Sequence, residues 1–184
     1  MTDGLIQPRT VILLFRIGLL AGFLLAAWRW SDWRRWQRYY PTLLFVMVAN
    51  LAAGYITYHH PLWDFNADTL AVSETTVELL NTFVLLPTAT LVYLSNYPAA
   101  GPARQARYIL AWIALFATIE TADTIVGGIS YFNGWSLAHS VLFDCVMFPI
   151  VRLHHLRPPL AWLASLAVAL YILVAFGFFS AEMK

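Results

Sequence analysis

Long apolar runs with almost no charge are the feature of this sequence that most constrains its fold. Residues 11–28 contain a single charged side chain, Arg16, and residues 160–179 contain none. An α-helix needs roughly 20 apolar residues to cross the hydrocarbon core of a bilayer, and each run has about that length. Charged residues form 11% of the chain, against about 25% in a typical soluble domain. We therefore expect a surface that faces lipid.

Runs of this kind predict an all-α fold, a polytopic transmembrane bundle in which residues 1–184 form one integral membrane domain. About six membrane-spanning helices are expected, at residues 11–28, 41–58, 76–94, 108–126, 135–151 and 160–179. The fifth is the weakest prediction, because it is short and contains His139, Asp144 and Pro149. Pro87 and Pro149 fall inside predicted helices, where proline removes a backbone hydrogen bond and favours a kink.

Basic residues give the orientation of these helices. Eight of the eleven Lys and Arg residues lie on alternate predicted loops: Arg29, Arg34, Arg35, Arg38, Arg104, Arg107, Arg152 and Arg157. The positive-inside rule places those loops in the cytoplasm and both termini outside. The segment 28–40 mixes Arg with Trp and Tyr, which is typical of an interfacial helix on an anionic lipid surface.

Polar and ionisable side chains inside the predicted spans are the candidate functional residues, because each is costly at membrane depth and needs a partner or a purpose. With the predicted orientation most of them fall in one outward-lying layer, and Arg16 lies roughly 8 Å into the first helix. The predicted polar intramembrane site consists of Arg16, Glu78, Asn81, Glu120, Asp123, His139 and Asp144, with Asn50 as a neutral neighbour.

Glu120 and Asp123 are three residues apart and therefore share one face of a helix. Two carboxylates in a medium of low dielectric favour a nearby cation, and Arg16 is the basic side chain expected at that depth. We therefore hypothesise an ion pair between Arg16 and Glu120 or Asp123. The alternative is that Arg16 extends to the outer headgroups.

Three functions of different classes remain open, and an intramembrane enzyme is the least favoured of them. The first is a small transporter or channel whose outward-facing acidic site binds a small cation, a proton or another solute. The second is a non-catalytic assembly or scaffold protein whose buried polar residues serve helix packing, as a homo-oligomer or with a membrane partner. Both place the chain in a lipid bilayer, and neither requires a cofactor.

Other classes are disfavoured by the sequence. The net charge of +1 gives no electrostatic case for nucleic acid, and the catalytic motifs of hydrolases, zinc proteases and phosphate-binding loops are missing, so we expect no enzyme. Cys145 is the single cysteine, so no cysteine cluster can bind metal. His59, His60, Asp64 and Asp68 on one outer loop match no known metal-binding spacing, and an ordinary interfacial loop is the preferred interpretation.

Several short motifs resemble the CBO0543 family, small multi-helix membrane proteins of spore-forming Gram-positive bacteria. The resemblance covers roughly residues 36–163 and rests on residues 40–45 (YPTLLF), 61–63 (PLW), Pro87, 97–98 (YP), Glu120, 134–135 (GW), Ser140, 152–155 (RLHH) and 159–162 (PLAW). It implies a bacterial plasma membrane, in a multi-pass arrangement, and a possible link to spores. It implies no reaction, substrate or catalytic residue.

Overall fold

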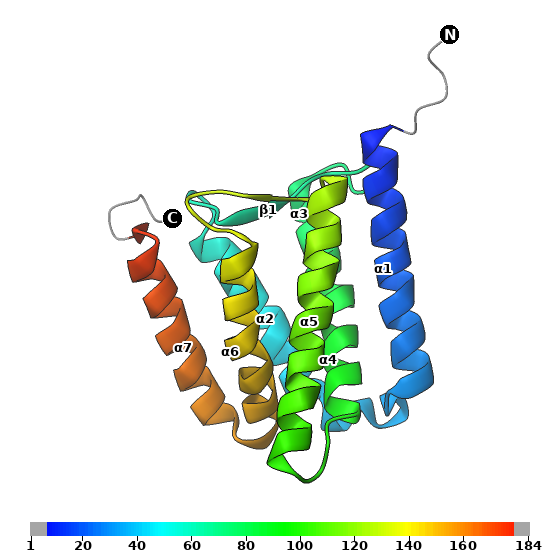
Figure 1. Cartoon of the computed structure of the whole chain (residues 1–184), viewed down its shortest axis with the longest axis vertical. Coiled ribbons are helices and arrows are strands. Elements are labelled where there is room, and N and C mark those ends of the chain that lie inside the picture. The colour runs from blue at the N-terminus through cyan, green and yellow to red at the C-terminus, as the bar shows by residue number, and fades with distance from the viewer. Residues whose placement is uncertain (1–6, 179–184) are drawn as a thin grey trace.

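The computed structural model describes residues 7–178, which form a bundle of six helical passes (Figure 1). These are α1 (Pro8–Trp30), α2 (Tyr40–Ile56), a composite helix of α3 (Glu74–Leu80), η2 (Asn81–Leu85) and α4 (Leu86–Ser95), then α5 (Pro102–Val126), α6 (Leu137–Leu156) and α7 (Pro158–Ala175). Successive passes run in opposite directions, so α1 begins and α7 ends at the same end of the bundle (Figure 1). The all-α fold is confirmed.

The lengths of the helices match the thickness of a bilayer. Within residues 7–178, five passes of 18 to 25 residues are long and apolar enough to cross a membrane. The shortest pass is α2, with 17 residues, or roughly 25 Å at 1.5 Å per residue. The predicted weak point was the fifth pass, yet α6 has 20 residues and continues through Pro149 as one helix.

The third pass contains a wider turn instead of a simple proline kink. The segment η2 is a π-helix, in which the N–H of Leu86 donates to the carbonyl of Asn81, five residues earlier. Pro87 follows immediately and has no N–H to donate, which disfavours a regular α-helical turn at this point. A π-turn of this kind is frequent at functional sites.

Aromatic side chains form the core of the half of the bundle that carries most arginines. Tyr93, which is 1% exposed, packs between Trp112 and Phe148, with ring centroids 5.5 and 5.2 Å away. Its hydroxyl donates to the carbonyl of Phe148 at 3.0 Å, and Tyr108 donates to the carbonyl of Tyr93 at 3.0 Å. This core fixes α4, α5 and α6 against each other below the polar layer.

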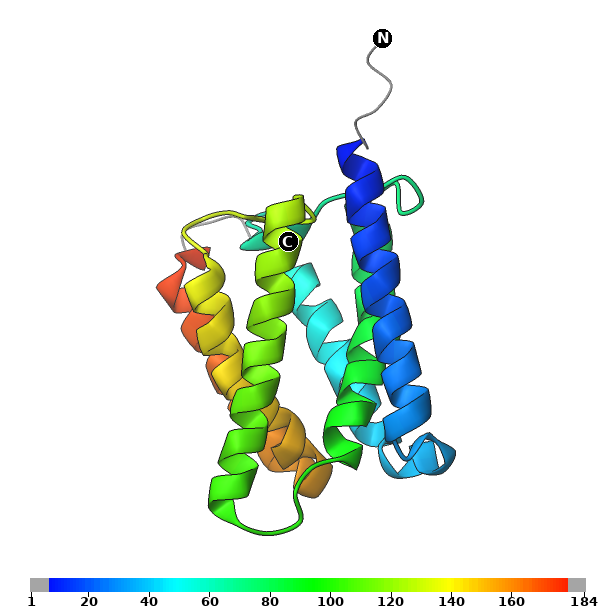
Figure 2. The same ribbon diagram turned by 45° about the vertical axis from the view of Figure 1, so that its right-hand side comes forward.

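A short antiparallel ribbon covers the opposite end of the bundle. Strand β1 (Trp63–Phe65) pairs with β2 (Ile129–Tyr131), with Asp64 opposite Ser130. Both views place the segments that carry the strands across the end where α1 begins (Figures 1 and 2). The sequence predicted an ordinary interfacial loop for the first of these segments. We call this ribbon, together with residues 66–73, the roof.

The arginine-rich end differs in structure from the roof. The segment η1 (Trp33–Arg38) is a 3₁₀-helix, and Trp28, Trp30, Trp33 and Trp36 are exposed. Two hydrogen bonds fix the flanking chain to α4: Ser95 Oγ accepts from the N–H of Asp32, and Asn96 Nδ2 donates to the carbonyl of Trp30. Exposed Trp beside Arg is the composition expected at a membrane–water interface.

Candidate functional site

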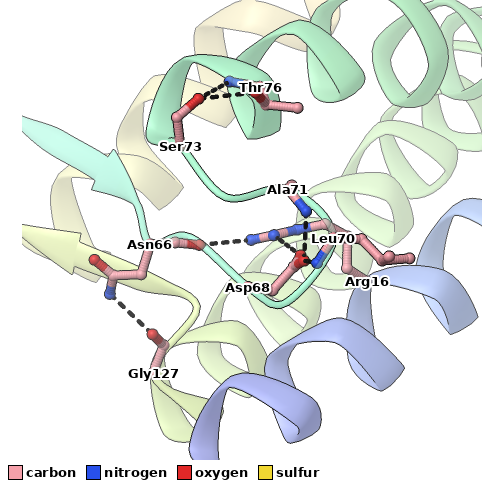
Figure 3. Close-up of polar contacts among 8 residues, drawn as sticks. All are labelled: Arg16, Asn66, Asp68, Leu70, Ala71, Ser73, Thr76 and Gly127. Carbon is pink, nitrogen blue, oxygen red and sulfur yellow. Dashed lines mark hydrogen bonds and ion pairs between the residues drawn. The ribbon is translucent and has the colours of Figure 1, made fainter.

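Arg16 connects α1 to the roof (Figure 3). Its guanidinium forms an ion pair with Asp68 and donates a second hydrogen bond to the carbonyl of Asn66 at 3.1 Å. Both members of the pair are buried, at 6% and 1% exposure. The hypothesis that Arg16 pairs with Glu120 or Asp123 was therefore wrong, because a loop 52 residues away in sequence folds inward and supplies the partner.

Asp68 also organises the turn on which it lies. Its carboxylate accepts the backbone N–H groups of Leu70 and Ala71, both at 2.7 Å (Figure 3). Burial raises the pKa of Asp68, but the two N–H groups and the Arg16 charge outweigh burial and hold the pKa below its ordinary value. Asp68 is therefore a carboxylate at neutral pH, and it compensates the charge of Arg16.

Asn66 extends this network to the second half of the roof. Its backbone N–H donates to the carbonyl of Gly128 at 2.8 Å. Its side-chain amide donates to the carbonyl of Gly127 and to Ser130 Oγ, both at 2.8 Å. Arg16, Asp68 and Asn66 thus join α1, the residues before α3 and the connection from α5 to β2 into one structure.

A cavity of about 180 Å³ lies beneath the roof, between α1, α2, η2, α5 and α6. Its polar lining comes from five different segments: Arg16, Asn50, Asn81, Glu120, Asp123, Ser140 and Asp144. Asn81, at the start of η2, lies seven residues after the start of α3, and Asp144 lies seven residues after the start of α6, which is roughly 10 Å along each helix. The cavity therefore lies inside the bundle, at the depth of the predicted polar layer.

The three cavity carboxylates have different environments. Glu120 Oε1 accepts the hydroxyl of Tyr131, in β2, at 2.6 Å. Asp123 lies against the backbone of Gly128: a Cβ at that glycine would be 2.0 Å from Asp123 Oδ1. Asp144 is 6% exposed, and no residue in the range 7–178 forms a hydrogen bond or an ion pair with it. Asp144 is thus a buried acid that faces the cavity without a partner.

Tyr131 acts as a neutral hydrogen-bond donor in this arrangement. Burial, together with its hydrogen bond to Glu120, raises the pKa of Tyr131 to about 12. The phenol therefore keeps its proton at any physiological pH. Its bond to Glu120 links the roof to α5, beside the cavity.

Two predicted site residues do not line the cavity. Glu78 projects from α3 toward α2, where its Oε1 lies 2.1 Å from the position that a Cβ on Gly54 would occupy. His139 Nδ1 forms a hydrogen bond with Ser136 Oγ at 2.9 Å, and its ring packs 5.2 Å from that of Phe176. The other five predicted residues, Arg16, Asn81, Glu120, Asp123 and Asp144, all face the cavity.

Aromatic rings form much of the rest of the lining. Trp63 and Phe65 contribute from the roof, Trp135 from the connection that precedes α6, and Phe143 from α6 itself. Trp63 and Trp135 lie with ring centroids 5.1 Å apart, and Trp135 Nε1 donates to Ser140 Oγ at 2.9 Å. The site therefore combines carboxylates with aromatic faces.

The donor set does not suit a metal centre. Across residues 7–178 no three His, Cys, Asp or Glu side chains are grouped closely enough to hold a metal ion. His60 packs against Phe178, with ring centroids 4.9 Å apart, and Asp68 is paired with Arg16. The outer-loop His and Asp residues therefore do not converge.

Sequence reasoning missed the partner of Arg16 and the roof. The available signals were weak: residues 63–65 and 129–131 each place a polar residue between two apolar ones, which is a short β pattern. Comparisons with protein-family models, with curated proteins and with solved structures find no match to this chain.

Proposed function

We propose that this chain is a small multi-pass membrane transporter that binds a cationic solute in the acidic cavity beneath its roof. The observation that carries the proposal is Asp144, a nine-tenths-buried acid that faces the cavity and has no hydrogen bond or ion pair within the described range. An unpaired carboxylate at membrane depth is costly, and a bound cation or proton compensates it.

The charges around the cavity support a cation over an anion. Glu120, Asp123 and Asp144 face it from α5 and α6, whereas the charge of Arg16 is compensated by Asp68. A cation in the cavity therefore meets an excess of carboxylates. The same carboxylates would repel an anion.

A scaffold protein is the competing function. In that case the buried polar groups would bond across helices, as Asn50 Nδ2 does with Thr82 Oγ1 at 2.8 Å. Asp144 makes no such contact with another helix in the described part of the chain. This difference favours a binding site over packing alone.

A flux assay in proteoliposomes tests the proposal. The wild-type protein should move protons, Na⁺ or a small organic cation down an imposed gradient. Asp144→Asn and Glu120→Gln should each reduce the rate at least about tenfold. Glu74→Gln, which removes an exposed acid outside the cavity, should leave the rate unchanged. A wild-type protein that is correctly folded and moves none of these cations would overturn the proposal.

The cellular setting belongs to the same proposal. The apolar passes support a lipid bilayer as the environment of the chain. We infer a bacterial plasma membrane from the resemblance to the CBO0543 family. Fractionation of a native host, with an antibody against the chain, tests that assignment; recovery in another membrane would contradict it.

A further inference from the structure

We propose that the cavity selects a small organic ammonium ion, held between its carboxylates and its aromatic rings, over a metal or alkali cation. This inference rests on the proposed function, since it names the class of cation that the site binds. It goes further because it assigns a role to the aromatic lining, which cation binding alone does not require.

The volume of the cavity sets the size of the ligand. An apolar cavity of about 150 Å³ in another protein holds one benzene molecule. The present cavity, of about 180 Å³, therefore holds a group slightly larger than one six-membered ring. A quaternary ammonium head with a short substituent, such as choline, has this size.

The distribution of charge sets the position of the ligand inside the cavity. Arg16 lies on the α1 side and disfavours a cation there, although Asp68 compensates much of its charge. Asp144 lies on α6, whereas Glu120 and Asp123 lie on α5, which packs against α1. A cation is therefore most stable near α6, beside the buried carboxylate of Asp144.

Aromatic rings line the same cavity. Phe143 belongs to α6 with Asp144, Trp135 lies two residues before the start of α6, and Trp63 of the roof lies 5.1 Å from Trp135, measured between ring centroids. The face of an aromatic ring attracts an organic cation, most strongly when the cation is desolvated, and such rings recognise quaternary ammonium groups in other proteins. A carboxylate next to several rings is the combination that this ligand class requires.

Inorganic cations are a poorer match for the same lining. Ca²⁺ takes about six to eight oxygen ligands at about 2.3 to 2.6 Å, and Mg²⁺ demands octahedral geometry and gives up its water ligands reluctantly. The described residues bring no three acidic or histidine side chains together at such a point. An organic ammonium ion needs no such ligand shell, because its alkyl groups are satisfied by apolar contact.

Binding of radiolabelled choline to the detergent-purified full-length protein tests the inference. Competitors are 3,3-dimethylbutan-1-ol, which is the neutral analogue of choline, together with NaCl and MgCl₂ at matched ionic strength. Choline should bind at least about tenfold more tightly than its neutral analogue. Asp144→Asn should abolish the preference, and Glu74→Gln should not alter it.

A second variant keeps the test valid if Asp144→Asn does not fold. Phe143→Leu retains an apolar side chain but removes one aromatic face, so it should weaken choline binding about threefold or more. Its effect on the neutral analogue should be smaller. Trp fluorescence gives an independent signal, because Trp63 and Trp135 line the cavity.

The outcomes separate this inference from the proposed function. Equal affinity for choline and its neutral analogue would overturn the inference, since charge would then play no part. Flux of Na⁺ or protons without choline binding would overturn the ligand class and leave a cation site in place. Neither binding nor flux, in a folded wild-type protein, would overturn both.

Discussion

Asp68 lies on a connecting loop, yet at 1% exposure it is among the most buried side chains in residues 7–178. The reason is Arg16, whose charge cannot remain unpaired inside the bundle. The loop turns inward because Asp68 satisfies two backbone N–H groups and the guanidinium together. One residue thus determines the path of the chain between β1 and α3.

Removal of the Asp68 charge should destabilise the protein strongly. Asp68→Asn leaves Arg16 as an uncompensated buried charge, and breaking one member of a buried pair costs about 3 to 5 kcal/mol. For a chain of this size that corresponds to a fall in melting temperature of about 6 °C or more. The measurement is thermal unfolding of the purified protein in detergent.

The matched control is the other ion pair in the described part of the chain. Asp32 lies 3.8 Å from Arg35 at the arginine-rich end, where the arginine side chain is 76% exposed. Exposed pairs contribute little, so Asp32→Asn should shift the melting temperature by about 2 °C or less. Equal shifts for the two variants would contradict the structural role assigned to Asp68.

Gly128 offers a substitution that changes the site without changing the core. A Cβ at this position would be 2.0 Å from Asp123 Oδ1, so Gly128→Ala must displace that carboxylate. A side-chain terminus moves at small energetic cost, so the melting temperature should change by about 2 °C or less, while cation flux or binding should fall several-fold. Gly18→Ala, with nothing within 4 Å of the new Cβ, is the control. Unchanged flux and binding in Gly128→Ala would exclude Asp123 from the site.

At the scale of the elements, the roof is the part of the fold that most clearly serves the site. Two strands of three residues have little stability by themselves, since even a longer isolated hairpin is marginal in water. Here two hydrogen bonds hold the roof against the helices. The hydroxyl of Tyr131 donates to Glu120, and the carbonyl of Asn66 accepts from Arg16. The cavity and its cover therefore depend on the same polar residues.

The pairing of the strands is directly testable by cross-linking. Asp64 and Ser130 are opposite each other, and the Cα atoms of such a pair are about 5 Å apart. In a Cys145→Ser background, Asp64→Cys with Ser130→Cys should react with a short bifunctional thiol reagent to give one intrachain link, read by peptide mass spectrometry. Asp64→Cys with Ala103→Cys, at opposite ends of the bundle, should give none. Failure of the first pair to link would contradict the ribbon.

The helices were predictable from sequence because hydropathy is a local property. The apolar runs gave six passes, and the depth of Glu120, Asp123 and Asp144 followed from counting residues along them. The pair of Arg16 with Asp68 was not predictable, because it depends on a loop that turns back into the bundle. The same holds for η2. Pro87 predicted an irregular helix at this point, but tertiary context decides whether the irregularity is a simple kink or a π-turn.

At the scale of the whole molecule, charge is divided between the two ends of the bundle. Eight arginines lie at one end, joined there by Asp32. The other acidic residues in the described range lie toward the roof: Asp64, Asp68, Glu74, Glu78, Glu120, Asp123 and Asp144. The positive-inside rule predicts that the roof faces outward and that the arginines face the cytoplasm.

Labelling of single cysteines in intact cells tests this orientation. In a Cys145→Ser background, Thr69→Cys on the roof should react with a membrane-impermeant maleimide, whereas Ala103→Cys at the start of α5 should react only after the cells are opened. Both positions are exposed, so accessibility in the folded protein does not limit either reaction. The reverse pattern would place the arginine-rich end outside and contradict the assignment.

The depth of the cavity has an electrical consequence. A cation that enters from the roof end and reaches Asp144, roughly 10 Å along α6, crosses part of the transmembrane voltage. The full voltage is worth about 2.3 kcal/mol per charge for each 100 mV, and a third of it about 0.8 kcal/mol. With the proposed cation site and the predicted orientation, the field of a cell whose interior is negative should draw the cation inward, and an energised membrane should raise occupancy of the cavity by roughly fourfold per 100 mV.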